Sequence, residues 1–267
     1  MLQYLDYPFF VNALIGVVLI SLCSAMIGTY IITRRMVAIS GGITHACFGG
    51  LGLGYFLGMN PIIMAAVFAV ASALGVEVMS DRLRLREDSA IAVIWSCGMA
   101  LGVLFVFLTP GYVPELNAFL FGNILTVSRG DLWAFGIYAL VLLLFFVRQY
   151  RNIVAIAFDR DFALVNGLPV RFVSYTMTVL VAVGIVLTIR LVGIMLLMSM
   201  LSLPIITAEI RYHRFLPVML GSAALSLIAS VSGLFLSTVV DVPCSALIVL
   251  LMVLFFGIGR IAKSFSA

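Results

Sequence analysis

Long apolar stretches, separated by short polar connections, constrain this chain more than any other feature. A helix that crosses a bilayer needs about 20 mainly apolar residues, and in lipid the backbone polar groups must be satisfied within helices or closed barrels. Nine runs approach that length: Phe9–Ile32, Ile39–Gly58, Pro61–Met79, Ala90–Leu108, Leu132–Val147, Phe172–Ile189, Leu191–Ala208, Phe215–Ser237 and Cys244–Gly259. We therefore predict an all-α polytopic membrane protein with eight to nine transmembrane helices, in which residues 1–267 form one transmembrane domain.

Two places leave the helix count open. Thr188–Gly193 separates two of the runs and fits either a tight turn or a polar break within one bent segment. The run Leu116–Val127 is too short to span, so we expect a short re-entrant or interfacial helix there.

Charge placement predicts the orientation. The chain is 64% hydrophobic and 10% charged, far from the composition of a soluble domain. Its basic residues lie between the runs, not in one patch, which argues against a nucleic-acid partner. If these connections are cytoplasmic, only Arg129 and Arg190 of the 15 basic residues lie near the outer face. We predict a multi-pass protein of a bacterial inner membrane, with its N-terminus outside and its C-terminus cytoplasmic.

The sequence lacks common motifs of nucleotide-hydrolysing enzymes and of other hydrolytic enzymes. It contains no P-loop, HExxH or GxSxG pattern, so the chain cannot hydrolyse ATP itself. The outer connections, such as Met59–Pro61 and Val240–Pro243, are short and rich in turn formers. Capture of a scarce solute would therefore need another protein.

His45 is the clearest polar residue within an apolar run. Ionisable groups in membrane spans are costly and indicate function, and a neutral imidazole is a common metal ligand. The alternative is a histidine that donates one hydrogen bond across a helix contact. Cys47 and Cys97 are candidate soft ligands or small buried hydrophobes. Glu77 falls near the end of its run and is expected to face the membrane boundary.

The longest cytoplasmic interruption runs from Arg148 to Arg171. Apolar residues alternate there with Asp159, Arg160 and Asp161, and Gly167 and a following proline end the pattern. This is typical of an amphipathic helix at the membrane face. Two interpretations stay open: a loop on lipid headgroups, or a helix that receives force from a cytoplasmic motor.

Several segments together resemble the permease subunits of the zinc/manganese family of bacterial ABC importers. They occur in the family's order along nearly the whole chain: Arg34–Met36 followed by Ile43–Ala46, Ala118–Asn123, Asp161–Gly167, and Leu191–Gly193 through Leu203–Pro204. The resemblance implies an ABC-importer permease fold and an inward-moving divalent metal, Zn²⁺ or Mn²⁺, with no permanently bound cofactor. It also implies a second permease copy, two copies of a cytoplasmic ATP-binding subunit and an extracytoplasmic metal-binding protein.

The resemblance also assigns residues. His45 matches the position thought to line the metal path, and Asn123 stands where many relatives have an aspartate after Phe-Gly. The positions implied to contact the ATPase are Asp159, Asp161, Phe162, Ala163, Asn166 and Gly167. Gly41 replaces an aspartate that relatives carry one helical turn before His45. An altered metal preference, a ligand from elsewhere and a weak transient site are all compatible with this loss.

Three other functions are weighed against this one. An importer of a metal chelate or organic cofactor would need a wider pathway. A stand-alone secondary transporter would ordinarily use ionisable residues near the membrane midplane, of which His45 is nearly the sole example. An intramembrane enzyme would need a positioned acid, nucleophile or second histidine beside it.

Overall fold

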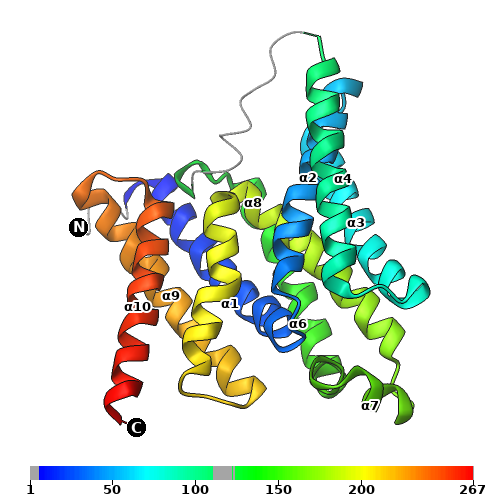
Figure 1. The fold of residues 1–267 in the computed structure, drawn as a ribbon. Helices are drawn as coiled ribbons and strands as arrows, with labels where there is room; N and C mark the ends of the chain where they lie inside the picture. The colour runs from blue at the N-terminus through cyan, green and yellow to red at the C-terminus, as the bar shows by residue number, and fades with distance from the viewer. Residues whose placement is uncertain (1–5, 111–121, 123, 267) are drawn as a thin grey trace. The chain divides into compact units, whose positions relative to one another are not determined.

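The computed structural model describes residues 6–110, 122 and 124–266, and every regular element within them is helical. The elements, drawn in Figure 1, are α1 (Pro8–Thr33), α2 (Val37–Leu57), α3 (Pro61–Leu83), α4 (Glu87–Leu108), the 3₁₀ turn η2 (Ile124–Thr126), α6 (Arg129–Phe158), α7 (Arg160–Val165), α8 (Val170–Glu209), α9 (Phe215–Val240) and α10 (Cys244–Ser266). Eight of these helices are long and apolar enough to cross a membrane. The predicted all-α polytopic fold is confirmed.

Helix α8 accounts for two of the nine expected runs. It contains 40 residues, a length of about 60 Å at 1.5 Å per residue. Gly193 interrupts it with φ 80° and ψ 171°, a backbone conformation that is essentially restricted to glycine. The two runs are thus helical segments that meet at a kink, so the break lies within one bent element.

Helix α6 is longer than expected. The apolar run was expected to end at Val147, but the helix continues to Phe158. Ile153 and Ile156 in this extension are almost fully buried, so packing sustains the helix past Arg148 and Arg151. The cytoplasmic interruption expected from Arg148 to Arg171 therefore begins as a continuation of α6, and α7 with its flanking turns forms a separate short helix within it.

The expected re-entrant helix at Leu116–Val127 falls mostly on residues 116–121 and 123, which lie outside the described residues. Its last part contains the 3₁₀ turn η2.

The chain divides into two compact units, to both of which α6 and α8 contribute. The second unit, Arg34–Leu116 with Gln149–Val186, is built on α2, α3 and α4. Glycines allow the backbones of α2 and α4 to touch. A Cβ added at Gly98 would lie 2.5 Å from the Cα of Ala46, and one at Gly102 would lie 2.6 Å from the carbonyl oxygen of Phe48. The neighbouring backbone thus leaves no room for a side chain at either position.

The first unit is Met1–Thr33, Asn117–Arg148 and Leu187–Ala267. Ile32 at the end of α1 packs against Ala208 of α8 and Val218 of α9. A Cβ at Gly259 of α10 would contact Ile210 just beyond α8, at 3.2 Å. The connection after α8 and the last turns of α10, both basic, therefore lie at the same end of this unit.

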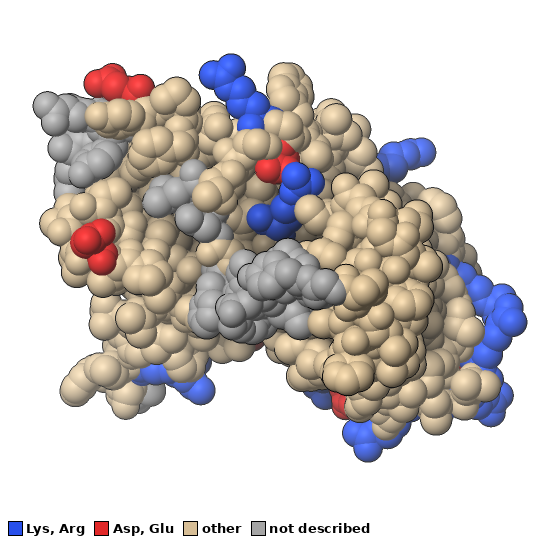
Figure 2. Space-filling model, turned by 90° about the horizontal axis from the view of Figure 1, so that it is seen from above, with Lys and Arg blue, Asp and Glu red and all other residues tan. Residues whose placement is uncertain are grey.

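Much of the protein surface is apolar. Exposed side chains include Phe107 at 87%, Trp133 at 75% and Val147 at 72%. Figure 2 shows a mostly uncharged surface on which charged side chains stand singly or in small groups. Such a surface is compatible with contact to lipid and incompatible with full exposure to water.

Candidate functional site

His45 lies in the middle of α2, about 12 Å along the helix axis from Val37. Its ring is half-buried and stacks on Trp95 of α4, with centroids 4.6 Å apart and planes 7° apart. Phe48, almost one turn further along α2, lies 6.0 Å away. The Gly98–Ala46 contact brings α4 close enough for this stack to form.

The imidazole of His45 has an unused nitrogen. Its Nδ1 is buried, and no hydrogen-bond partner for it occurs among the described residues. A buried polar atom without a partner is costly, and most such atoms have an explanation such as an ion or a water. The described helices therefore do not supply the cross-helix hydrogen bond that was the alternative interpretation of His45.

The two cysteines predicted beside His45 do not join it. Cys47 is two residues further along α2, which turns its side chain about 200° away, and its thiol donates to the carbonyl oxygen of Ile43 at 3.0 Å. Cys97 is exposed and lies two residues beyond the stacked Trp95. Within the described part of the chain, no three His, Cys, Asp or Glu side chains are arranged to hold a metal. Asn123 lies outside the described residues.

The predicted coupling residues form a capped helical turn. Asp159 accepts a hydrogen bond from the backbone N–H of Phe162 at 2.9 Å, a helix N-cap. Asn166 donates to the carbonyl oxygen of Phe162 at 2.8 Å, and Gly167 ends the segment with φ +71°. Ala163 is buried, whereas Asp161 and Phe162 are exposed. The turn thus presents apolar and acidic groups outward.

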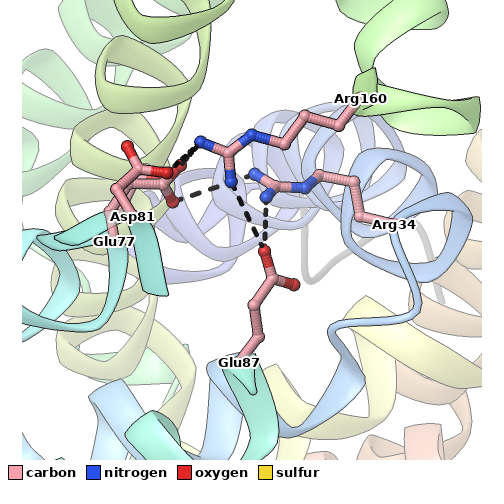
Figure 3. Close-up of polar contacts among 6 residues, drawn as sticks. Arg34, Glu77, Asp81, Glu87 and Arg160 are labelled. Carbon is pink, nitrogen blue, oxygen red and sulfur yellow. Dashed lines mark hydrogen bonds and ion pairs between the residues drawn. The ribbon is translucent and has the colours of Figure 1, made fainter. Parts of the chain in front are cut away.

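A cluster of five charged side chains links this turn to the second unit's helices, and sequence reasoning missed it. Figure 3 shows Arg34, before α2, and Arg160, the first residue of α7, converging on Glu77 and Asp81 of α3 and Glu87 of α4. Arg34 Nη2 lies 2.7 Å from Glu87 Oε1, and Arg160 Nη2 lies 3.7 Å from Glu77 Oε1 and pairs directly with Asp81. We name these five residues the charge cluster.

Glu77 is the most deeply placed member of the charge cluster. Its side chain is 1% exposed, and its Oε2 accepts a hydrogen bond from Thr178 of α8 at 3.3 Å. The expectation that Glu77 faces the membrane boundary was wrong, because two guanidiniums make its burial possible. A buried carboxylate is retained only when it is paired.

A second ion pair lies in the first unit. Arg190 Nη2 of α8 is 2.8 Å from Asp131 Oδ1 in the first turn of α6. The other carboxylate oxygen, Asp131 Oδ2, accepts from the Ser128 hydroxyl at 2.7 Å, which completes the helix start. Arg190 is one of the two basic residues that the predicted orientation places near the outer face. Its charge is thus neutralised by a neighbouring carboxylate.

Comparison with known proteins gives the family. Residues 6–263 match the ABC 3 transport family. The chain belongs to this family. A probable metal transport system membrane protein of Chlamydia pneumoniae is 37% identical over 249 residues, 91% of this chain and 84% of that protein. The manganese transport system membrane protein MntC of Halalkalibacterium halodurans is 34% identical over 261 residues, 96% and 88% of the two chains.

A solved structure described as PsaBC from Streptococcus pneumoniae in complex with Fab is similar to this ABC 3 family protein, with a TM-score of 0.82 and 28% identity. The likeness covers 97% of this chain and 95% of that one. The resemblance that the motifs indicated is thereby confirmed, together with the expected permease fold of ABC importers.

Proposed function

We propose that this ABC 3 family protein is the permease subunit of an importer that carries a divalent transition metal ion into the bacterial cytoplasm by alternating access. One observation carries the proposal: the Nδ1 of His45, halfway along a membrane-length helix, is buried and has no hydrogen-bond partner among the residues that the structure describes. The names of two relatives, which refer to manganese and metal transport, support it. We expect Mn²⁺ or Zn²⁺ as the cargo.

His45 acts in this proposal as a weak, transient ligand. One imidazole without a neighbouring carboxylate, since Gly41 occupies the preceding turn, binds an ion less tightly than a complete ligand set. Transport requires binding that is favourable enough for entry and weak enough for release. Water or a second permease copy would complete the coordination.

The energy would come from two copies of a separate ATP-binding subunit, because this chain contains no P-loop. The turn at α7 is the proposed docking element: Phe162 is 61% and Val165 is 87% exposed, and apolar side chains at a helix tip suit a groove in a partner. An extracytoplasmic metal-binding protein would deliver the ion, since the outer connections are too short to capture it.

The proposed orientation places the N-terminus outside and the C-terminus in the cytoplasm of a bacterial inner membrane. It is supported by the basic connections at the ends of α1, α3, α8 and α10, as the positive-inside rule requires. The charge cluster and α7 would then lie on the cytoplasmic side.

The test is metal uptake by vesicles that contain the permease with its ATP-binding and metal-binding partners. His45→Ala should lower uptake of the true cargo at least about tenfold, since even outer-shell partners of metal ligands have effects of this size. The matched control is His213→Ala, because His213 is the second of the chain's two histidines and is exposed. Zinc, manganese and iron are compared in parallel.

Two outcomes would reject parts of the proposal. Unchanged uptake of all three metals in His45→Ala would remove His45 as a needed ligand. Failure of the permease to co-purify with any ATP-binding subunit, or uptake by the permease alone under an ion gradient, would reject the importer in favour of a secondary transporter.

A further inference from the structure

Helix α7 has little packing of its own to hold it in place. It contains six residues, of which Ala163 alone is buried. A helix this short is not stable in isolation. Besides the chain's connections to α6 and α8, the ion pairs of Arg160 with Glu77, Asp81 and Glu87 link the first residue of α7 to the rest of the protein.

These ion pairs reach three helices that pack closely against one another. The backbones of α2 and α4 touch at Gly98 and Gly102. A Cβ at Gly54 of α2 would likewise lie 2.6 Å from the Cα of Pro61 in α3. Helices in such contact cannot slide without breaking close packing. We call α2, α3 and α4 the three-helix body, and it carries both His45 and Trp95.

The charge cluster connects α7 to both α3 and α4 of this body. Arg160 spans α3 through Glu77 and Asp81, and α4 through Glu87, at 4.0 Å from its Nη1. Arg34 contacts Glu87 and Glu77 from the start of α2. Arg160 is 24% exposed and Glu77 is 1% exposed, so the pairing occurs where water screens charge poorly.

We propose that Arg160 is a positioning residue that couples the docking helix to the metal path: its ion pairs with Asp81 and Glu77 make the three-helix body follow α7. A displacement of α7 by the ATP-binding subunit would then move His45 and Trp95 together. This inference rests on the proposed function, because it assumes that α7 is the docking element.

The experiment uses the complete importer in vesicles and measures Mn²⁺ transported and ATP hydrolysed in the same sample. In the complexes that Arg160→Ala forms, ATP hydrolysis should continue. The ratio of metal to ATP should fall about tenfold, within the usual range of coupling between sites. Arg160→Lys, which keeps the charge, should recover much of the ratio. Arg151→Ala is the matched control, because Arg151 is exposed on α6, nine residues before Arg160, and should keep the wild-type ratio.

A purely structural role for Arg160 predicts a different result. In that case fewer complexes would form, but each would keep the wild-type ratio, and this outcome overturns the inference. An unchanged ratio in Arg160→Ala overturns it as well. If Arg160→Ala does not assemble, Asp81→Asn replaces it: the substitution is nearly isosteric and weakens a single pair, and an unchanged ratio in that variant again rejects the inference.

The two proposals fail in different ways. If the wild-type complex does not move metal, or does not form, the proposed function fails. If the wild type transports metal, and the Arg160 and Asp81 variants keep the wild-type ratio of metal to ATP, the importer stands. The positioning role of Arg160 is then rejected.

Discussion

At the scale of single residues, the stack of His45 on Trp95 decides what the imidazole can do. A ring 4.6 Å from a parallel indole has lost rotational freedom, so its nitrogens point in fixed directions. Preorganised ligands bind more tightly than mobile ones because less entropy is lost on binding. In the proposed role of His45 as a metal ligand, the aromatic partner would compensate in part for the carboxylate missing at Gly41.

Trp95→Ala should raise the metal concentration needed for half-maximal uptake by about 2- to 10-fold, because an aromatic pair contributes about 0.5–1.5 kcal/mol. Trp95→Phe should retain most of the affinity. The measurement is uptake rate against metal concentration in the complete importer. Trp133→Ala is the control, since the chain's other tryptophan is 75% exposed on α6. Equal half-saturation in both alanine variants would contradict a role for the stack.

Sequence reasoning identified His45 because a polar residue within an apolar run is costly and conspicuous. It could not have placed Glu77, whose burial depends on partners far away in the chain. The pair of Arg34 with Glu87 spans 53 positions, and that of Arg160 with Asp81 spans 79. No local pattern reports such pairing. Cys47 and Cys97 looked like ligands by residue type, and only helix geometry separates them from His45.

At the scale of elements, α2 illustrates how small residues replace the hydrophobic effect within a membrane. Lipid tails are as apolar as leucine, so helices associate through close van der Waals contact. The glycines of α2 and α4 provide this contact, and they also bring Trp95 to His45. The close packing of α2 and the proposed role of His45 thus depend on the same contact with α4.

Gly98→Ala should lower the stability of the purified protein by about 1–3 kcal/mol, the usual effect of overpacking, because its Cβ would lie 2.5 Å from the Cα of Ala46. Gly136→Ala is the matched control. A Cβ there meets nothing within 4 Å, so the higher helix propensity of alanine should stabilise α6 slightly. Thermal unfolding in detergent measures both. A shift of the same sign and size in the two variants would contradict the close contact.

The positions of most helices could be predicted, because an apolar run of bilayer length has few alternatives in lipid. Helix ends could not be predicted where packing overrides hydropathy. Arg148 and Arg151 interrupt the apolar run, yet buried Ile153 and Ile156 extend α6 beyond them. Gly193 is a single residue whose backbone conformation, not its hydropathy, separates the segments of α8.

At the scale of the whole molecule, the length of α8 bears on topology. About 60 Å of helix equals two crossings of a hydrocarbon core of about 30 Å. If the kink at Gly193 lets α8 cross twice, its two ends lie on the same side of the membrane. A single crossing would put them on opposite sides.

Single cysteines in a cysteine-free background distinguish these topologies with a membrane-impermeant thiol reagent. We expect Leu164→Cys and His213→Cys to react only after cells are permeabilised, and Val242→Cys to react in intact cells, because all three positions are exposed and the basic connections should be cytoplasmic. Labelling of position 213 in intact cells, with 164 protected, would show that α8 crosses once. Metal uptake by each variant confirms that it is folded.

The charge cluster also has a consequence for biosynthesis. Asp81 is synthesised 79 residues before Arg160. Because translation adds about 5–20 residues per second, Arg160 is made about 4–16 s after Asp81. Arg34, already made, can hold Glu77 in the meantime. The three-helix body can thus form early, whereas α7, which is synthesised after α6, can pair with it only later. The contacts of Arg160 therefore form after those within the three-helix body.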